Sequence, residues 1–186
     1  MDYFFFGIQG SGKGTQTKLL GQNYNIPVFE TGHELRTMAM QDTELGRRVK
    51  QTIEGGDLVT NEIVMEIVEA FISTNEDAKH LIFDGIPRNK DQQAMLHQLL
   101  ENHGRDYSAV LITLTKPEAM TRLLKRAEIE GRADDTKEGI EKRINIFFEQ
   151  TEPLLSHYRQ NHQLIEIKGD QTVEAVYTEE VAKLDL

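Results

Sequence analysis

The sequence predicts an α/β fold in which a parallel sheet of five strands is flanked by helices. Short apolar runs alternate with longer amphipathic segments along the chain. Strands that alternate with helices form parallel sheets whose two faces are both covered. A glycine-rich turn also follows the first apolar run, at the kind of strand end where such sheets bind ligands.

The apolar runs define the expected strands, and the segments between them define the expected helices. We expect strands at residues 3–8, 27–30, 80–84, 109–115 and 164–168. We expect helices at residues 13–24, 31–54 with a break near Asp42, 61–73, 91–101, 117–130, from about 136 onward, and 173–184. Pro117 suits the first turn of its helix. Asp135 with Glu138 resembles a capping box for the helix that follows.

The composition excludes several classes of function. The 186 residues carry a formal net charge of −10, which disfavours long-range attraction to nucleic acid. The chain has no cysteine, so it forms no disulfide and no cysteine-ligated zinc site. It lacks a basic leader with a long apolar stretch, and no apolar run approaches the roughly 18 residues of a membrane span. We therefore expect a cytoplasmic protein that binds neither nucleic acid nor membrane.

A glycine-rich loop at residues 7–15 is the clearest functional motif. Its sequence is Gly7-Ile8-Gln9-Gly10-Ser11-Gly12-Lys13-Gly14-Thr15. The loop follows an expected strand and opens an expected helix, which is the context of a phosphate-binding loop. Glycine lets backbone N–H groups converge on phosphate oxygens, and Lys13 adds a positive charge. The loop predicts a nucleoside triphosphate site, although Gly14 separates Lys13 from the hydroxyl residue that the strict motif places beside it.

Five segments together resemble the adenylate kinase family of nucleoside monophosphate kinases. They are Gly12-Lys13-Gly14-Thr15-Gln16, Thr31-Gly32-His33-Glu34-Leu35-Arg36, Gly56-Asp57-Leu58-Val59, Phe83-Asp84-Gly85-Ile86-Pro87-Arg88 with Gln92, and Gly131-Arg132-Ala133-Asp134-Asp135 with Arg126 and Arg143. They cover essentially the whole chain, in the family's order and at its spacings. The match is to the members with a short lid. His33 stands where the family usually has aspartate.

The resemblance implies one domain of the P-loop NTPase type with two small inserted parts. The core would comprise residues 1–30, 60–127 and 136–186. A helical lobe at residues 31–59 would bind the monophosphate, and a short lid at residues 128–135 would close over the donor. The implied activity is reversible, Mg²⁺-dependent phosphoryl transfer from ATP to AMP, which gives two ADP and serves nucleotide homeostasis. The implied protein is a monomer.

The resemblance also implies the roles of individual residues. The residues implied to bind ATP are Gly10, Ser11, Gly12, Lys13, Gly14, Thr15, Arg126 and Gln171. The residues implied to bind AMP are Thr31, Arg36, Asp57, Leu58, Val59, Gly85, Ile86, Pro87, Arg88, Gln92, Arg132 and Arg143. The implied catalytic cations are Lys13, Arg88, Arg126, Arg132 and Arg143. Cations suit this chemistry because phosphoryl transfer depends on positioning and charge neutralisation, and guanidinium binds two phosphate oxygens at once.

Carboxylates complete the implied site. Asp84 ends an expected strand and would orient a water ligand of Mg²⁺. Asp134 and Asp135 would pair with basic residues when the lid closes, and Asp135 also suits a helix cap. The short lid lacks ligands for structural zinc.

The choice of acceptor depends on Gln92 and Thr31. An amide can donate and accept at once, which matches the edge of adenine. UMP/CMP kinases usually have asparagine and alanine at these two positions, so we expect AMP as acceptor and ATP as the default donor. The Arg88-Asn89 pair resembles the UMP/CMP kinases, which are the alternative. A nucleotide-binding sensor with reduced catalysis is a further alternative, although Lys13 and the motif arginines are intact.

The remaining charged residues are expected to have ordinary surface roles. Solvated arginines are expected at Arg47, Arg48, Arg105 and Arg159, and Arg122 is either such a residue or close to the donor. Surface or boundary positions are expected for His80, His97, His103, His157 and His162. Gln9 and Ile86 depart from the proline and the aromatic residue that are usual in the family, which bears on rate rather than on reaction type.

Overall fold

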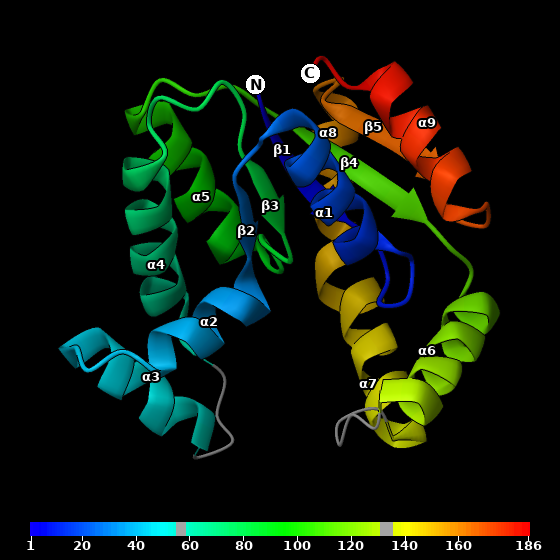
Figure 1. Cartoon of the computed structure of the whole chain (residues 1–186), viewed down its shortest axis with the longest axis horizontal. Helices are drawn as coiled ribbons and strands as arrows, with labels where there is room; N and C mark the ends of the chain where they lie inside the picture. Colours follow the sequence, from blue (N-terminus) through cyan, green and yellow to red (C-terminus); the bar gives the residue numbers. More distant parts are fainter. Residues whose placement is uncertain (55–58, 131–135) are drawn as a thin grey trace.

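A computed structural model describes residues 1–54, 59–130 and 136–186, with only the backbone at residues 53, 54, 129 and 130. Five parallel strands form one sheet in the order β2-β3-β1-β4-β5 (Figure 1). The strands are β1 (Asp2–Phe6), β2 (Val28–Glu30), β3 (Ile82–Asp84), β4 (Tyr107–Thr113) and β5 (Leu164–Lys168). Helices cover both faces, so the predicted fold class is confirmed.

The central strand β1 shows why two layers of helices are needed. All five of its residues are buried, and successive side chains point to opposite faces of the sheet. Phe4 and Phe6 pack with α4 (Asn61–Thr74), α5 (Lys90–Asn102) and α8 (Glu152–Gln160). Tyr3 and Phe5 pack with α1 (Lys13–Tyr24) and α9 (Val173–Lys183). Each buried aromatic side chain contributes roughly 1.5–3 kcal/mol of transfer free energy.

Two helix pairs extend beyond the carboxyl edge of the sheet. The first pair is α2 (Thr31–Ala39) and α3 (Glu44–Glu54), separated near Asp42 as predicted. The second pair is α6 (Lys116–Glu130) and α7 (Lys137–Ile146). In Figure 1 the first pair lies at the lower left and the second at the lower right. This arrangement leaves the carboxyl ends of the strands facing the space between the two pairs.

The helix that begins after residue 136 runs to Gln160 with one irregular turn. α7 is followed by a π-helical segment, η1 (Phe147–Thr151), and then by α8. The cap of α7 is Thr136, whose hydroxyl accepts from the N–H of Gly139 at 3.1 Å. The expected cap, Asp135, lies outside the described residues, and the prediction was wrong by one position. Thr136 has the extended backbone that a capping side chain requires.

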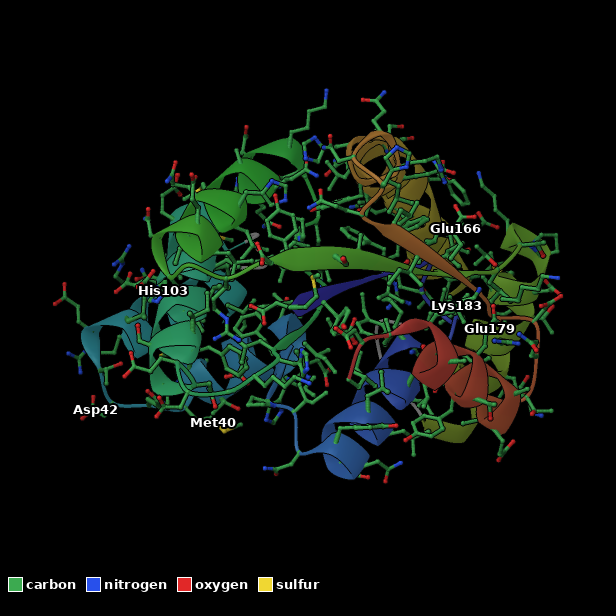
Figure 2. The ribbon with its side chains drawn as sticks, turned by 90° about the horizontal axis from the view of Figure 1, so that it is seen from above. Met40, Asp42, His103, Glu166, Glu179 and Lys183 are labelled. Carbon is green, nitrogen blue, oxygen red and sulfur yellow. The ribbon has the colours of Figure 1, made fainter. Side chains whose placement is uncertain are left out.

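The two chain ends lie side by side, away from the helix pairs (Figure 1). The hydroxyl of Tyr3 donates to the carbonyl of Asp185 at 3.0 Å and accepts from its N–H at 3.1 Å. Lys183, labelled in Figure 2, donates to the carbonyl of Glu166 at 2.7 Å and pairs with Glu179 at 2.7 Å. These contacts hold α9 against β1 and β5. No helix among the described residues is long and apolar enough to cross a membrane.

One predicted surface charge is instead buried. Arg105 forms two hydrogen bonds with the carboxylate of Asp2, at 2.7 and 2.8 Å. The side chain of Asp2 is 1% exposed and that of Arg105 is 12% exposed. Asp2 also accepts from the N–H of Leu81 at 2.9 Å. A buried carboxylate needs such partners, and here they come from a distant part of the chain.

One histidine, His80, lies deeper than expected, whereas His97 lies at the boundary as predicted. His80 is 6% exposed and its ring bonds to the carbonyl of Met1 at 2.7 Å. His97 stacks on Tyr107 with ring centres 4.4 Å apart and bonds to the hydroxyl of Tyr158 at 2.9 Å. Burial is the larger cause of a lowered pKa of His97, which is about 4, and the nearby His157 is the smaller cause. This half-buried histidine is therefore neutral at physiological pH.

Candidate active site

A cavity of about 850 Å³ opens at the carboxyl edge of the sheet. Its walls come from the glycine-rich loop, α1, the ends of β2 and β3, and the helices α2, α6 and α7. The lining residues are Gln9, Gly10, Gly12, Lys13, Gly14, Thr15, Lys18, Leu19, Gln22, Glu30, Gly32, Arg36, Asp84, Gly85, Arg88, Arg122, Leu123, Arg126 and Arg143. Parallel pairing places Glu30 beside Asp84, and Asp84 beside Phe5. The sheet thus brings segments that are far apart in sequence to one pocket.

The glycine-rich loop has the shape of an anion cradle. Gly10 and Gly12 have φ values of 85° and 99°, which side-chain-bearing residues rarely adopt. A Cβ on Gly10 would lie 3.2 Å from the carbonyl of Ala119, whereas one on Gly12 would meet nothing within 4 Å. No side chain caps the start of α1. The first N–H groups of this helix are therefore available for an anion in the open space before Gly12.

Lys13 and Asp84 form the charged floor of the pocket. Lys13 donates to the carbonyl of Gly7 at 2.7 Å. Desolvation lowers the pKa of Lys13, and the negative charge of Asp84 opposes this shift. Burial raises the pKa of Asp84, while Lys13 acts in the opposite direction and Glu30 adds to the rise. Ions held so far from water interact more strongly with a bound charged group than surface ions do.

Positive charge dominates the pocket. Its cations are Lys13, Lys18, Arg36, Arg88, Arg122, Arg126 and Arg143, and its anions are Glu30 and Asp84. The chain as a whole carries a formal charge of −10. A basic pocket in an acidic protein suits a small polyanion such as a nucleotide, and it disfavours a long nucleic acid.

Most of the residues expected to contact nucleotides line the cavity or lie next to it. Those that line it are Gly10, Gly12, Lys13, Gly14, Thr15, Arg36, Gly85, Arg88, Arg126 and Arg143. Ser11 belongs to the loop itself and is 2% exposed. Thr31 is 6% exposed and donates to the carbonyl of Asp84 at 3.2 Å. Ile86 and Pro87 are buried in the turn before Arg88, and Val59 packs against the core.

Other expected contacts do not come together in the described structure. The amide of Gln171 bonds to the carbonyl of Lys168 at 3.0 Å and to Glu179 at 2.6 Å, and it is not part of the cavity wall. Five expected site residues lie outside the described residues: Asp57, Leu58, Arg132, Asp134 and Asp135. Gln92 is 8% exposed, and its amide is engaged with Arg88 and Asn61.

The cavity also contains residues that the motifs did not predict. Lys18 and Gln22 follow Gly14 at intervals of four along α1, a spacing that puts them on one helix face and that could have indicated them. Glu30 ends β2 as Asp84 ends β3, which is the same signal that indicated Asp84. Arg122, which had two possible assignments, donates to the carbonyls of Gly10 at 3.3 Å and Gly169 at 2.9 Å.

The oxygen ligands of the pocket suit a hard cation that arrives with a nucleotide. The carboxylate of Asp84 lies 3.6 Å from where a Cβ on Gly14 would be, so it faces the phosphate loop. Thr15 offers a hydroxyl at the pocket wall. Among the described residues no three His, Asp or Glu side chains converge as a metal cage. This sparse set fits Mg²⁺, which keeps several water ligands and binds through phosphates and one or two carboxylates.

Comparison with known proteins adds an independent line of evidence. The sequence model of the family described as "Adenylate kinase" matches residues 5–163. An adenylate kinase of Bacteroides thetaiotaomicron is 35% identical over 180 residues, which are 96% of this chain and 95% of that protein. One of Thermus thermophilus is 37% identical over 174 residues, 93% of this chain and 91% of that protein. One of Maricaulis maris is 38% identical over 177 residues, 95% of this chain and 94% of that protein.

Proposed function

Because this chain belongs to the adenylate kinase family, we propose that it transfers the γ-phosphoryl group of ATP to AMP, reversibly, through the residues of this pocket. Its activity is that of an ATP:AMP phosphotransferase, a nucleoside monophosphate kinase. The observation that carries the assignment is the meeting of the phosphate loop with Arg36, Arg88, Arg126 and Arg143 in one cavity. A site for two polyanions needs this concentration of cations.

The donor half of the proposed site is built on the start of α1. The N–H groups of residues 10–15 surround the phosphates of ATP, and Lys13 lies between the β- and γ-phosphates. Arg126 approaches from α6, with Arg122 beside the loop. Gln171 remains a proposed contact to the donor nucleoside.

The acceptor half faces the loop from the other side. Arg36 and Arg88 hold the phosphate of AMP, and Arg143 bridges the donor and acceptor phosphates. Thr31, Gln92 and the segment Gly85-Ile86-Pro87 form the proposed surroundings of the base and ribose. Asp57, Leu58 and Val59 are proposed to close this half.

Catalysis in this scheme is positioning plus charge neutralisation. The arginines bring the phosphate oxygen of AMP in line with the γ-phosphorus of ATP and stabilise the negative charge of the transferred group. No general base is needed, because the acceptor phosphate is already largely ionised at pH 7. Mg²⁺, held through water by Asp84, would neutralise charge on the donor phosphates. Thr15 lies on the same wall of the pocket and would help to position that ion.

The proposed lid, residues 128–135, would fold over the bound nucleotides. It would bring Arg132 to the phosphates, and Asp134 and Asp135 would pair with basic residues in the closed state. Closure would exclude water that otherwise hydrolyses ATP. The proposed monophosphate lobe, residues 31–59, contains α2 and α3, and the remainder, residues 1–30, 60–127 and 136–186, would be the core.

We propose a cytoplasmic monomer that works on free nucleotides. The cations that line the described cavity already serve both proposed halves of the site, which supports transfer within a single subunit. The net charge of −10 supports free nucleotides rather than nucleic acid as ligands. A chain without cysteine works unchanged in a reducing compartment.

The reverse reaction gives the most direct test. Purified protein is mixed with ADP and Mg²⁺, and ATP and AMP are separated and measured over time. We expect equal amounts of ATP and AMP to form, and none when Mg²⁺ is chelated. No conversion of ADP would contradict the proposal. In the forward direction, use of UMP or CMP in place of AMP would favour a UMP/CMP kinase instead.

A further inference from the structure

Three side-chain amides meet where the starts of α4 and α5 come together. Asn61 is the first residue of α4, Asn89 caps α5, and Gln92 lies in the first turn of α5. The Oδ1 atom of Asn61 accepts from Nε2 of Gln92 at 3.0 Å and from Nδ2 of Asn89 at 3.4 Å. Gln92 is 8% exposed, so water does little to replace these bonds.

Backbone N–H groups fix which way each amide points. The N–H of Arg88 donates to Oε1 of Gln92 at 2.8 Å, and the N–H of Gln92 donates to Oδ1 of Asn89 at 2.9 Å. A backbone N–H can only donate, so both amides must place their oxygens there. Both therefore present their NH₂ groups to Asn61. Asn61 must therefore turn its Oδ1 atom toward these two NH₂ groups, and it acts only as an acceptor toward Gln92 and Asn89.

The fixed orientation of Gln92 matters for reading a base. After these two bonds, one N–H and one oxygen lone pair of the Gln92 amide remain available. Adenine presents an amino donor beside a ring acceptor, whereas uracil presents a carbonyl acceptor beside a ring donor. In one binding pose, the two bases need opposite orientations of the same amide. Gln92 is bonded to the backbone of Arg88, whose guanidinium lines the cavity, so its amide lies beside the proposed acceptor half.

We propose that Asn61 is a positioning residue that locks the Gln92 amide in one orientation and thereby selects the acceptor base. This inference rests on the proposed function and deepens it. Turning the amide over would set an NH₂ group against the N–H of Arg88 and an oxygen against Oδ1 of Asn61. Asn61 is responsible for one of these two unfavourable contacts. Replacing Asn61 removes that contact, so the turned amide, which suits a pyrimidine base, forms more readily.

The test compares Asn61→Leu, which keeps the approximate size but cannot accept, with Asn61→Asp, which keeps an acceptor oxygen. We measure kcat and KM for AMP, ATP and UMP. For Asn61→Leu we expect the KM for AMP to rise about tenfold. We expect the ratio of kcat/KM for AMP to that for UMP to fall about tenfold, and the KM for ATP to stay unchanged. Asn61→Asp is expected to restore most of the selectivity.

Each outcome decides the matter. An unchanged ratio in a folded Asn61→Leu protein would overturn the inference, as would Asn61→Asp behaving like Asn61→Leu. If Asn61→Leu does not fold, Asn61→Ala takes its place in the same measurements. If neither variant folds, Asn61 has a structural role only and the inference is overturned. Disproportionation of ADP by the wild-type protein is measured alongside, so failure of the proposed function is distinguished from failure of this inference.

Discussion

Arg88 connects four parts of the molecule through separate groups of one residue. Its guanidinium lines the cavity, and its Nε atom donates to the carbonyl of Gly85 at 2.7 Å. Its N–H bonds to Gln92 at 2.8 Å, and its carbonyl accepts from the hydroxyl of Thr151 at 3.1 Å. The backbone bonds position the residue, and the Nε bond to Gly85 orients its guanidinium at the cavity wall.

We expect Arg88→Ala to lower kcat by about 10³ or more. The reason is the loss of the proposed two-point contact to the phosphate of AMP. The exposed position of the side chain predicts an intact fold. Steady-state kinetics and thermal unfolding check the two parts. Arg159→Ala is the control, because Arg159 pairs with Glu166 at 2.6 Å on the surface. Near-normal turnover of Arg88→Ala would refute the assigned role.

Glu180 is a buried acid that the proposed reaction does not use. It is 0% exposed, and neither carboxyl oxygen has a hydrogen-bond partner among the described residues. Burial, with a smaller effect of Glu179, raises the pKa of Glu180 from 4.5 to about 8. The carboxyl group therefore stays protonated in the folded protein over a range in which the unfolded chain ionises.

This raised pKa predicts a specific pH dependence of stability. The contribution of Glu180 is fully present below about pH 4.5, decreases as the pH rises, and is lost near pH 8. Glu180→Gln replaces the carboxyl group with an amide that does not ionise. The free energy of unfolding of this variant relative to wild type should therefore increase by about a few kcal/mol between pH 4.5 and 8. Urea unfolding at several pH values measures this difference.

The control for that measurement is Glu179→Gln. Glu179 pairs with Lys183 at 2.7 Å, and its pKa is lowered by that hydrogen bond. The stability of this variant relative to wild type should rise with pH much less than that of Glu180→Gln over the same range, because Glu179 makes only the smaller contribution to the raised pKa of Glu180. A pH-independent difference between Glu180→Gln and wild type would contradict the buried, protonated state of Glu180.

At the scale of elements, the π-helical segment η1 joins two helix faces that have different tasks. Ile140 and Ile144 of α7 pack against α6, whereas Leu154 and Tyr158 of α8 pack against the sheet. An extra residue in one turn rotates the second face relative to the first. The same turn directs the hydroxyl of Thr151 to the carbonyl of Arg88. η1 thus connects the packing of the long helix to the site.

We expect Thr151→Val to raise the KM for AMP about fivefold, the equivalent of one net hydrogen bond of about 1 kcal/mol. Valine preserves the shape of the side chain but cannot donate to Arg88. Initial-rate kinetics with AMP varied at saturating ATP give the value. Thr178→Val removes a similar hydroxyl, which donates to the carbonyl of Glu174 on the surface of α9, and should leave the KM unchanged. Equal KM values for both variants would show that η1 does not position Arg88.

Local patterns predicted the elements well where the decisive contacts are themselves local. The helix at 13–24 and the strand at 164–168 have the predicted bounds, since glycine, periodicity and apolar runs define them. The first strand ends two residues early, because Gly7 and Ile8 leave the sheet and Ile8 packs against α6 and α7. The π-helical turn has no sequence pattern of its own at this level and was not predicted.

Contacts between distant residues account for the other differences. Arg105 was expected in solvent, but its partner Asp2 lies 103 positions earlier in the chain. The motifs identified most of the cavity wall, because each motif follows a strand end and parallel strands share one edge. They did not predict that Gln92 is held by Asn61, 31 positions away, since no local spacing relates these two residues.

At the scale of the whole molecule, the opposite signs of pocket and body predict a salt effect. Nucleotides should be drawn into the basic cavity at low ionic strength, and salt should screen this attraction over distances of about 10 Å at 0.1 M. Raising NaCl from about 20 to about 200 mM should increase the KM for AMP severalfold and change kcat less. Steady-state kinetics at constant pH and free Mg²⁺ test this. A KM independent of salt would contradict it.

The central position of β1 has a consequence for how the protein is made. β1 is synthesised well before its neighbours β3 and β4, which begin at Ile82 and Tyr107. At bacterial or eukaryotic translation rates, the Phe4-Phe5-Phe6 run leaves the ribosome roughly 5–20 s before β4 is available to pair with it. During that interval an apolar strand has unpaired edges, which is the kind of segment that aggregates or binds chaperones. The segment that forms the centre of the finished sheet is therefore without its final partners for several seconds, roughly, in the nascent chain.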